Sequence, residues 1–307
     1  MNIPGKLRSK WSGIKREYIQ KRHFFYGPIA FVYAISPYLG SLNKYKHRAI
    51  LRELRKIIPN TSQKFADCCT EGEKPISKDC PIWVMWWQGC NNMPPLVKAC
   101  YASMLRNRGC HPVVFLDRNN YCEYVQLPPP IVKKCLKNGW ISTLSDMIRF
   151  GLLSKHGGIW LDSTIYVASE IGCFNQSLYS IRHKKGNPRW VLDGYRWSSF
   201  MFASSPNHPV TSFIFDGLIE YFTKEDFQID YFMTDYILSI GYLNNTSIRK
   251  CIDELPLDNP ECLKLLLLRD TPYNAEILKS IFHENRFNKL DWRIAPKEDS
   301  LLAHIML

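Results

Sequence analysis

The pattern of apolar and polar residues predicts a strand, a helix and a second strand beginning near residue 80. Residues 82–87 form a short apolar run, residues 96–107 repeat apolar positions with the period of a helix, and residues 112–116 form a second apolar run. This order and spacing predict a βαβ unit with parallel strands. Ligands of parallel sheets bind at the carboxyl ends of the strands, so we expect a site in the loops that follow these two runs.

Similar patterns continue through the rest of the chain. Predicted helices span residues 131–137, 145–156, 210–222 and 231–242, and residues 246–282 are mostly helical. Predicted strands span residues 159–161, 197–203 and 287–293. Alternating strands and helices are typical of an α/β fold. We therefore predict a single α/β domain over residues 79–307.

The stretch SDMIRFGLLSKHGGIWLDSTIYV, residues 145–167, places charged residues inside an apolar pattern. Asp146 and Arg149 are three apart on the predicted helix and share one face. A glycine turn follows, and the next strand leads into Asp162, whose face Thr164 would share on a continuing strand. Together these elements predict a floor for a polar ligand. The alternative is a surface ion pair beside an ordinary strand end.

Most of the positive charge lies at the start of the chain. The net charge is +12, and residues 1–56 contribute +11 of it, from 13 Lys or Arg against Glu17 and Glu53. The remainder holds 27 Lys or Arg and 26 Asp or Glu, a balance of +1. Because the body is nearly neutral and carries no RRM, zinc-finger or helix-turn-helix signature, we expect no nucleic-acid partner.

The basic N-terminal residues flank one uncharged stretch, residues 24–40. This stretch is shorter than the roughly 20 residues of a membrane-spanning helix, contains two prolines and has basic flanks on both sides. We predict that residues 1–58 form a helical segment that attaches to an anionic membrane surface through residues 1–56. The alternative is a helical hairpin packed on the domain. Residues 59–78 are polar and turn-rich, which predicts a linker.

The sequence lacks the motifs of dinucleotide-binding enzymes, P-loop NTPases, zinc proteases and serine hydrolases. There is no G-x-G-x-x-G, G-x-x-x-x-G-K-[ST], H-E-x-x-H or G-x-S-x-G pattern. The 11 cysteines include no C-x-x-C pair, which suits a reducing compartment. Short glycosylation sequons, two of them at Asn244 and Asn245, arise readily by chance.

The pattern S-D-x-x-R followed by K-H-G-G-I-W-L-D, residues 145–149 and 155–162, resembles the sugar-nucleotide site of the capsular polysaccharide synthesis glycosyltransferases. These are related to mannosyltransferase-like proteins with a DXD motif. The likeness includes residues 81–100 and 230–236 and covers roughly residues 80–293. It implies a GT-A-like (Rossmann-like) fold with a mixed, mainly parallel sheet, and a retaining transfer from a nucleotide-diphosphate sugar.

The resemblance also implies roles for particular residues. Asp162 would be a catalytic carboxylate, and Asp146 and Arg149 would bind the donor sugar and its diphosphate. Trp86 and Trp87 would form an aromatic wall for the base. Further donor-binding residues would be Gln88, Asp117, Ser163 and Lys289.

A divalent cation, Mn²⁺ or Mg²⁺, would be held by Asp162, because donor phosphates supply further oxygen ligands. Relatives carry a second acid where this chain has Thr164, and often a histidine where it has Asn288. A hydroxyl and an amide are weaker ligands, which leaves strict metal dependence open.

On the acceptor side, the resemblance places Asp235, Asp230 and Trp197. Asp235 would be the catalytic acid that orients the attacking hydroxyl. Helix caps or buried pairs are the alternative for the two aspartates.

We predict a glycosyltransferase that extends a capsular or O-antigen-type polysaccharide, or its lipid-linked precursor, at the cytoplasmic side of the bacterial inner membrane. Its partners would be a nucleotide-sugar donor and a glycan acceptor. Two alternatives remain: a secretory-pathway mannosyltransferase-like enzyme anchored by residues 24–40, and a non-catalytic membrane scaffold with a degenerate site.

Overall fold

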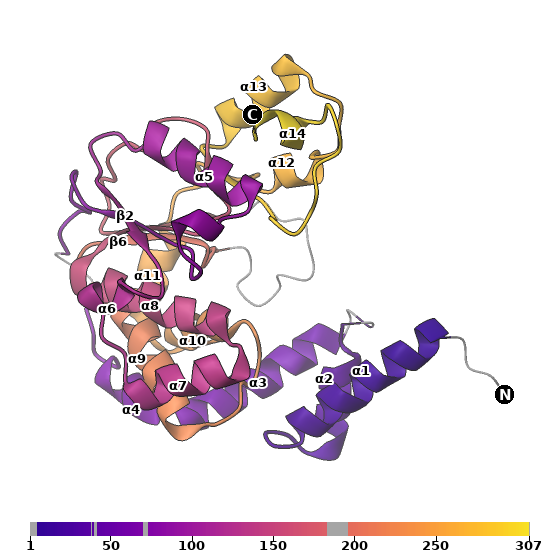
Figure 1. Cartoon of the computed structure of the whole chain (residues 1–307). Helices are drawn as coiled ribbons and strands as arrows, with labels where there is room; N and C mark the ends of the chain where they lie inside the picture. Colours follow the sequence, from indigo (N-terminus) through magenta and orange to yellow (C-terminus); the bar gives the residue numbers. More distant parts are fainter. Residues whose placement is uncertain (1–4, 38, 40–41, 70–72, 183–195, 307) are drawn as a thin grey trace.

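A computed structural model describes residues 5–37, 39, 42–69, 73–182 and 196–306 (Figure 1). Its centre is a five-stranded sheet of order β2-β1-β3-β6-β5. The strands are β1 (Ile82–Met85), β2 (Val113–Leu116), β3 (Gly158–Leu161), β5 (Leu178–Ser180) and β6 (Met201–Ser204). β1 is parallel to β2 and β3, whereas β6 is antiparallel to β3 and β5. This mixed sheet confirms the predicted α/β class.

Helices cover both faces of the sheet (Figure 1). α5 (Pro95–Arg106) lies on one face, and the other carries α7 (Pro129–Asn138), α8 (Ile141–His156), α9 (Pro209–Lys224) and α10 (Met233–Asn244). Neighbouring strand residues point to opposite faces, which explains the two layers. Trp83 and Met85 pack in the apolar cluster of α8, α9 and α10, while Ile82 and Val84 pack in the cluster that contains Met104 of α5.

Two glycines with positive φ, Gly157 at 66° and Gly158 at 102°, form the predicted turn between α8 and β3. A Cβ on Gly158 would lie 2.5 Å from the carbonyl oxygen of Pro81, so the absence of a side chain allows this close approach. Pro81 then accepts a hydrogen bond from the amide of Ile159 at 2.9 Å. The glycines thereby fix the level of β3 relative to β1.

A second, two-stranded sheet brings the C-terminal region beside β3. β4 (Ile165–Val167), which the sequence pattern did not predict, pairs antiparallel with β7 (Phe287–Lys289), and Ile165 lies opposite Lys289. β7 ends before the predicted limit at residue 293, because Asp291 closes a turn by accepting a hydrogen bond from the Arg293 amide. The helices of this region are α12 (Lys264–Leu267), α13 (Ala275–Glu284) and α14 (Leu301–His304).

The region predicted as mostly helical, residues 246–282, is interrupted. α11 (Thr246–Asp253) ends shortly before Pro256, and Pro260 lies in the turns that precede α12. Proline lacks an amide hydrogen and disfavours helix in the residue before it, which explains the break. Two short elements complete the domain, the 3₁₀ helix η2 (Cys90–Asn92) and α6 (Tyr121–Tyr124).

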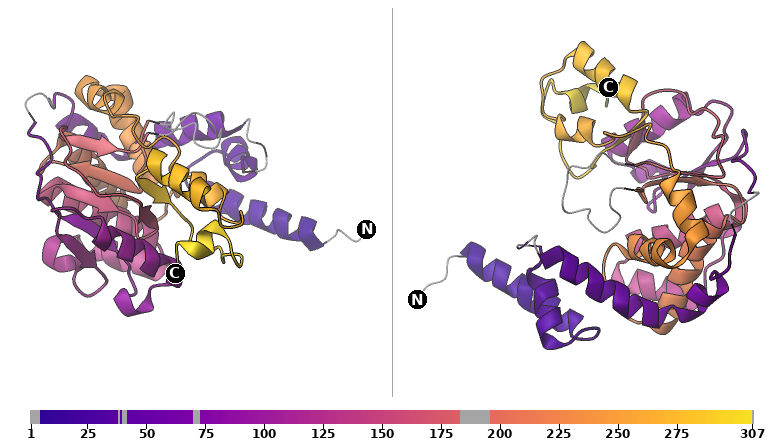
Figure 2. Two further views of the ribbon diagram at one scale, coloured as in Figure 1. Left: turned by 90° about the horizontal axis from the view of Figure 1, so that it is seen from above. Right: turned by 180° about the vertical axis from the view of Figure 1, so that it is seen from behind.

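The N-terminal helices are α1 (Gly5–Lys21), α2 (Gly27–Ile35), α3 (Asn43–Ile57) and α4 (Pro59–Lys64), and Figure 2 shows α1 and α2 beside each other. Ile50 and Leu54 of α3 are fully buried in the same apolar cluster as α9 and α10. α3 therefore packs on the domain. Residues 59–64, predicted as the start of a linker, form α4 instead, because Thr61 donates from both its amide and its hydroxyl to Glu220 of α9, each at 2.7 Å.

The predicted attachment of residues 1–58 to a membrane surface does not involve a membrane-spanning helix. Within the described ranges, none of the helices is both long enough and apolar enough to cross a membrane.

Candidate active site

Asp162 lies immediately after β3, and both of its carboxylate oxygens have partners. Oδ1 accepts hydrogen bonds from Arg149 Nη2 at 2.8 Å and from Trp160 Nε1 at 3.0 Å. Oδ2 accepts from Lys289 Nζ at 2.8 Å. Burial raises the pKa of Asp162, but the positive charges of Lys289 and Arg149 outweigh it, so the pKa lies below its usual value. Asp162 is therefore ionised at neutral pH and lies between two cations.

Arg149 joins α8 to the end of the sheet and is only 5% exposed. Its Nη1 donates to the Ser199 carbonyl at 2.7 Å and lies 3.0 Å from Asp146 Oδ1. Its guanidinium lies over the ring of Trp160, 5.0 Å from the centroid. The structure thus brings Asp146, Arg149 and Asp162 into one cluster, as the sequence predicted.

The two carboxylates of this cluster have different acidities. Burial raises the pKa of Asp146 to about 6, although the charge of Arg149 opposes the shift, and the neighbouring charge of Asp162 adds to it. Asp146 therefore changes its charge near neutral pH, whereas Asp162 stays ionised.

Thr164 approaches Asp162 by a different route from the one predicted. β3 ends at Leu161, and Ser163 and Thr164 form a turn closed by a 2.9 Å hydrogen bond from the Ile165 amide to the Asp162 carbonyl. The expectation that a continuing strand aligns Asp162 with Thr164 is therefore wrong. The two side chains still converge, because Lys289 Nζ donates to Thr164 Oγ1 at 2.7 Å as well as to Asp162. Ser163 lies half-buried in the turn.

Asn288 does not join this cluster. Adjacent residues on a strand point to opposite faces, and Lys289 is the β7 residue that reaches Asp162. The Asn288 side chain is fully buried and donates to the Asn285 carbonyl at 2.9 Å. The predicted ligand set of Asp162, Thr164 and Asn288 is thus not assembled. In the part of the chain that the structure describes, no three His, Cys, Asp or Glu residues gather in a metal-binding group.

The predicted nucleotide-binding residues lie at the carboxyl ends of β1 and β2. The Trp86 amide donates to the Leu116 carbonyl at 3.0 Å, which places the two loops side by side. The half-buried rings of Trp86 and Trp87 pack on Trp292 and Tyr121, with centroids 5.5 and 5.7 Å apart.

Gln88 and Asp117 complete these two loops. Gln88 is exposed, and its carbonyl accepts from Asn92 Nδ2 at 2.8 Å. Asp117 Oδ1 accepts from the Asn119 amide at 2.7 Å. The pairing of Trp83 with Trp160 puts Asp162 at the same edge of the sheet as both loops. The carboxyl ends of β1, β2 and β3 therefore converge, as predicted.

Asp235 and Trp197 contact each other at the start of α10. Trp197 Nε1 donates to Asp235 Oδ1 at 3.0 Å. Trp197 is 1% exposed and belongs to the main apolar cluster, so its ring packs in the core and presents no surface to an acceptor. Asp235 is half-buried.

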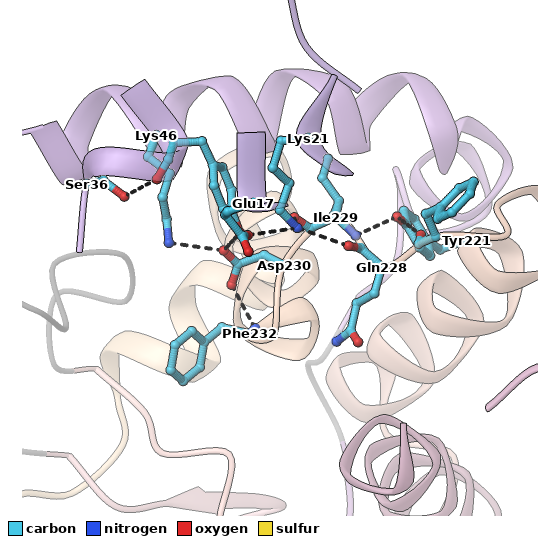
Figure 3. A network of polar contacts seen from close by, with 11 residues as sticks. Glu17, Lys21, Ser36, Lys46, Tyr221, Gln228, Ile229, Asp230 and Phe232 are labelled. Carbon is cyan, nitrogen blue, oxygen red and sulfur yellow. Dashed lines mark hydrogen bonds and ion pairs between the residues drawn. The ribbon is translucent and has the colours of Figure 1, made fainter. Parts of the chain in front are cut away.

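Asp230 lies before α10, not on it, and binds the N-terminal helices (Figure 3). Its Oδ2 accepts from the Tyr33 hydroxyl and pairs with Lys46 Nζ at 3.1 Å, and its Oδ1 accepts from the Phe232 amide at 2.9 Å. Lys21 donates to the adjacent carbonyl of Ile229 at 2.8 Å. Asp230 is 4% exposed, so its surroundings match the buried-pair alternative and not an acceptor site.

One member of the site, Trp160, was not predicted. It lies two residues before Asp162 and donates to it. Since residues two apart on a strand share a face, the sequence contained a signal for this contact.

Comparison with known proteins assigns most of the chain to a protein family. The model of the capsular polysaccharide synthesis protein family matches residues 37–306. A curated relative, O-glycosyltransferase braB of Annulohypoxylon truncatum, is 28% identical over 116 residues, which cover 33% of this chain and 27% of the relative. The chain thus spans about a quarter of that relative's length.

Among solved structures, the chain is similar to PaToxG Glycosyltransferase, with 13% identity, a TM-score of 0.43, and coverage of 65% of this chain and 81% of the other. The family match contains all four residues of the cluster, Asp146, Arg149, Asp162 and Lys289. It confirms the resemblance that the sequence pattern indicated. The chain belongs to the capsular polysaccharide synthesis protein family.

Proposed function

We propose that this protein is a glycosyltransferase that moves a sugar from a nucleotide-diphosphate sugar to a glycan acceptor. The observation that carries this proposal is the Asp162 carboxylate at the end of a central strand, held between the cations of Arg149 and Lys289. Cations are needed next to a leaving diphosphate, and carboxylates accept hydrogen bonds from sugar hydroxyls. The cluster offers both kinds of group within a few ångströms of each other.

Each residue then has a role that its contacts allow. Arg149 and Lys289 stabilise the negative charge that develops on the leaving diphosphate. Asp162 and Asp146 orient the donor sugar, while Trp86 and Trp87 contact the base. Asp235, oriented by Trp197, accepts a hydrogen bond from the attacking hydroxyl. Retention of the anomeric configuration is an expectation from the family.

The first experiment should identify the donor that the protein binds. We expect a UDP- or GDP-sugar to raise the melting temperature of the protein, since the donor binds the folded state alone. The same donor should be hydrolysed slowly without acceptor. Differential scanning fluorimetry and nucleotide release, each with EDTA and with Mn²⁺, test this. Absence of binding and of turnover with every donor would favour the non-catalytic scaffold.

For the acceptor, we propose a cell-surface polysaccharide or its lipid-linked precursor at the cytoplasmic side of the bacterial inner membrane. The family description supports the polysaccharide acceptor. The +11 charge of residues 1–56 supports attachment to an anionic membrane. Tyr26 and Tyr45 are 83% and 52% exposed in this segment, and aromatic residues suit the depth of lipid headgroups. Sedimentation with vesicles should show salt-sensitive binding to phosphatidylglycerol and little to phosphatidylcholine. Equal binding to both lipids would contradict an electrostatic attachment.

One of the two sequons named for the secretory alternative, that of Asn245, is blocked by its contacts. Asn245, one of its sequon residues, caps α11 and is 7% exposed. Its amide nitrogen, to which a glycan would be attached, donates to the carbonyls of Phe65 and Ala66 at 2.9 and 3.0 Å. A glycan at this position is incompatible with these contacts.

A further inference from the structure

The ammonium group of Lys289 lies beside Asp162 and contacts the oxygens through which the D-S-T sequence could bind a metal. Lys289 Nζ lies 2.8 Å from Asp162 Oδ2 and 2.7 Å from Thr164 Oγ1, so it bridges the carboxylate and the hydroxyl. These two oxygens belong to the first and third positions of the D-S-T sequence. A metal bound through this sequence would need the same oxygens.

The surrounding groups do not fit a divalent cation. The other oxygen of Asp162 is already bound by Arg149 and Trp160. A metal would have to displace Lys289 and remain close to two positive charges, which repel it strongly in a partly buried site. Thr164 offers only a neutral hydroxyl, and Asn288 points away. Hard cations such as Mg²⁺ prefer charged oxygen ligands, and Asp162 is the one carboxylate that Lys289 contacts among the described residues.

Lys289 is held in place by its backbone and its neighbours. It is part of β7, opposite Ile165, and its amide donates to the Cys262 carbonyl at 2.8 Å. The next amide, that of Leu290, donates to the Thr164 carbonyl at 2.9 Å, which ties β7 to the turn after Asp162. Its ammonium also lies 5.2 Å from the ring centroid of Phe200. The charge is thus preorganised at the carboxyl end of β3, where a diphosphate would arrive.

We propose that Lys289 is the resident cation of this site and neutralises the diphosphate of the donor in place of a divalent metal. The inference rests on the proposed function and deepens it, because it concerns how the same donor is bound. In the free protein the ammonium pairs with Asp162 and Thr164. When the donor binds, Nζ donates a charge-assisted hydrogen bond to a phosphate oxygen, and Asp162 turns an oxygen toward the sugar hydroxyls.

Calorimetric titration with UDP, GDP, ADP and dTDP tests the proposal, in buffer with EDTA and in buffer with Mn²⁺. The wild-type protein should bind one of these nucleotides with affinities that agree within about threefold in the two buffers. Lys289→Met should lower the affinity in EDTA about ten- to a hundredfold, as expected for the loss of one charge-assisted hydrogen bond. Lys289→Arg should retain part of the affinity, because it keeps the charge.

The matched control is Lys279→Met, which removes an exposed lysine of α13 and should leave the affinity unchanged. Thermal unfolding of Lys289→Met checks its folding, and the wild-type comparison of EDTA with Mn²⁺ needs no variant. Binding that requires Mn²⁺ would overturn the inference and leave the proposed function intact. Absence of binding by every nucleotide in both buffers would overturn the proposed function itself.

Discussion

Replacing Asp162 with asparagine should lower kcat/KM for sugar transfer by about a hundred- to a thousandfold, the usual cost of removing a preorganised charged group from a transition-state site. Asparagine has nearly the same shape, but it cannot hold both Arg149 and Lys289 as a carboxylate does. The two cations would then lose the partner that fixes their positions. Initial rates with the donor found by the binding screen measure the effect.

Asp216→Asn is the matched control for this experiment. Asp216 pairs with Lys64 on the surface, and its side chain is 29% exposed. An exposed ion pair of this kind contributes little to stability, so the control should retain wild-type activity. If Asp162→Asn kept activity within a few-fold of the wild type while folding normally, Asp162 would not belong to the reacting centre.

Replacing Asp230 with asparagine should lower the free energy of unfolding by about 3 kcal/mol, because breaking a buried ion pair leaves a charge without compensation. Lys46 and Tyr33 would lose their shared acceptor, and the buried ammonium of Lys21 lies nearby (Figure 3). The attachment of α1, α2 and α3 to the loop before α10 would weaken. Urea unfolding, together with the rate of tryptic cleavage in the N-terminal helices, measures this.

A nearby aspartate provides the comparison. Asp226 pairs with Lys134, but its side chain is 81% exposed, so Asp226→Asn should change stability by no more than about 0.5 kcal/mol. An equally small effect for Asp230→Asn would show that this buried ion pair contributes little to holding the N-terminal helices.

The central elements and the core of the site could be predicted because their signals are local. The apolar runs that became β1 and β2 and the helical period of α5 each lie within a dozen residues. Asp146 and Arg149 share one helix, and Asp162 follows it after a single turn and strand. Over such short distances, periodicity and glycine positions determine which side chains can meet.

The remaining contacts depend on parts of the chain that are far apart in sequence. Lys289 and Asp162 are 127 residues apart, and Asp230 and Tyr33 are 197 apart. No periodic pattern reports such pairs. The basic N-terminal segment is ambiguous for another reason, since an apolar stripe such as that of Ile50 and Leu54 looks the same whether it faces lipid or a protein core.

α3 shares an apolar core with α9 and α10, so the N-terminal helices and the domain depend on each other for folding. The two should therefore also be retained together in evolution. A detachable targeting sequence can be gained or lost between homologues without harm to the enzyme behind it. Here α3 covers apolar surface that would otherwise face water. A homologue that lost this helix would have to cover the same surface with another segment or with a second polypeptide.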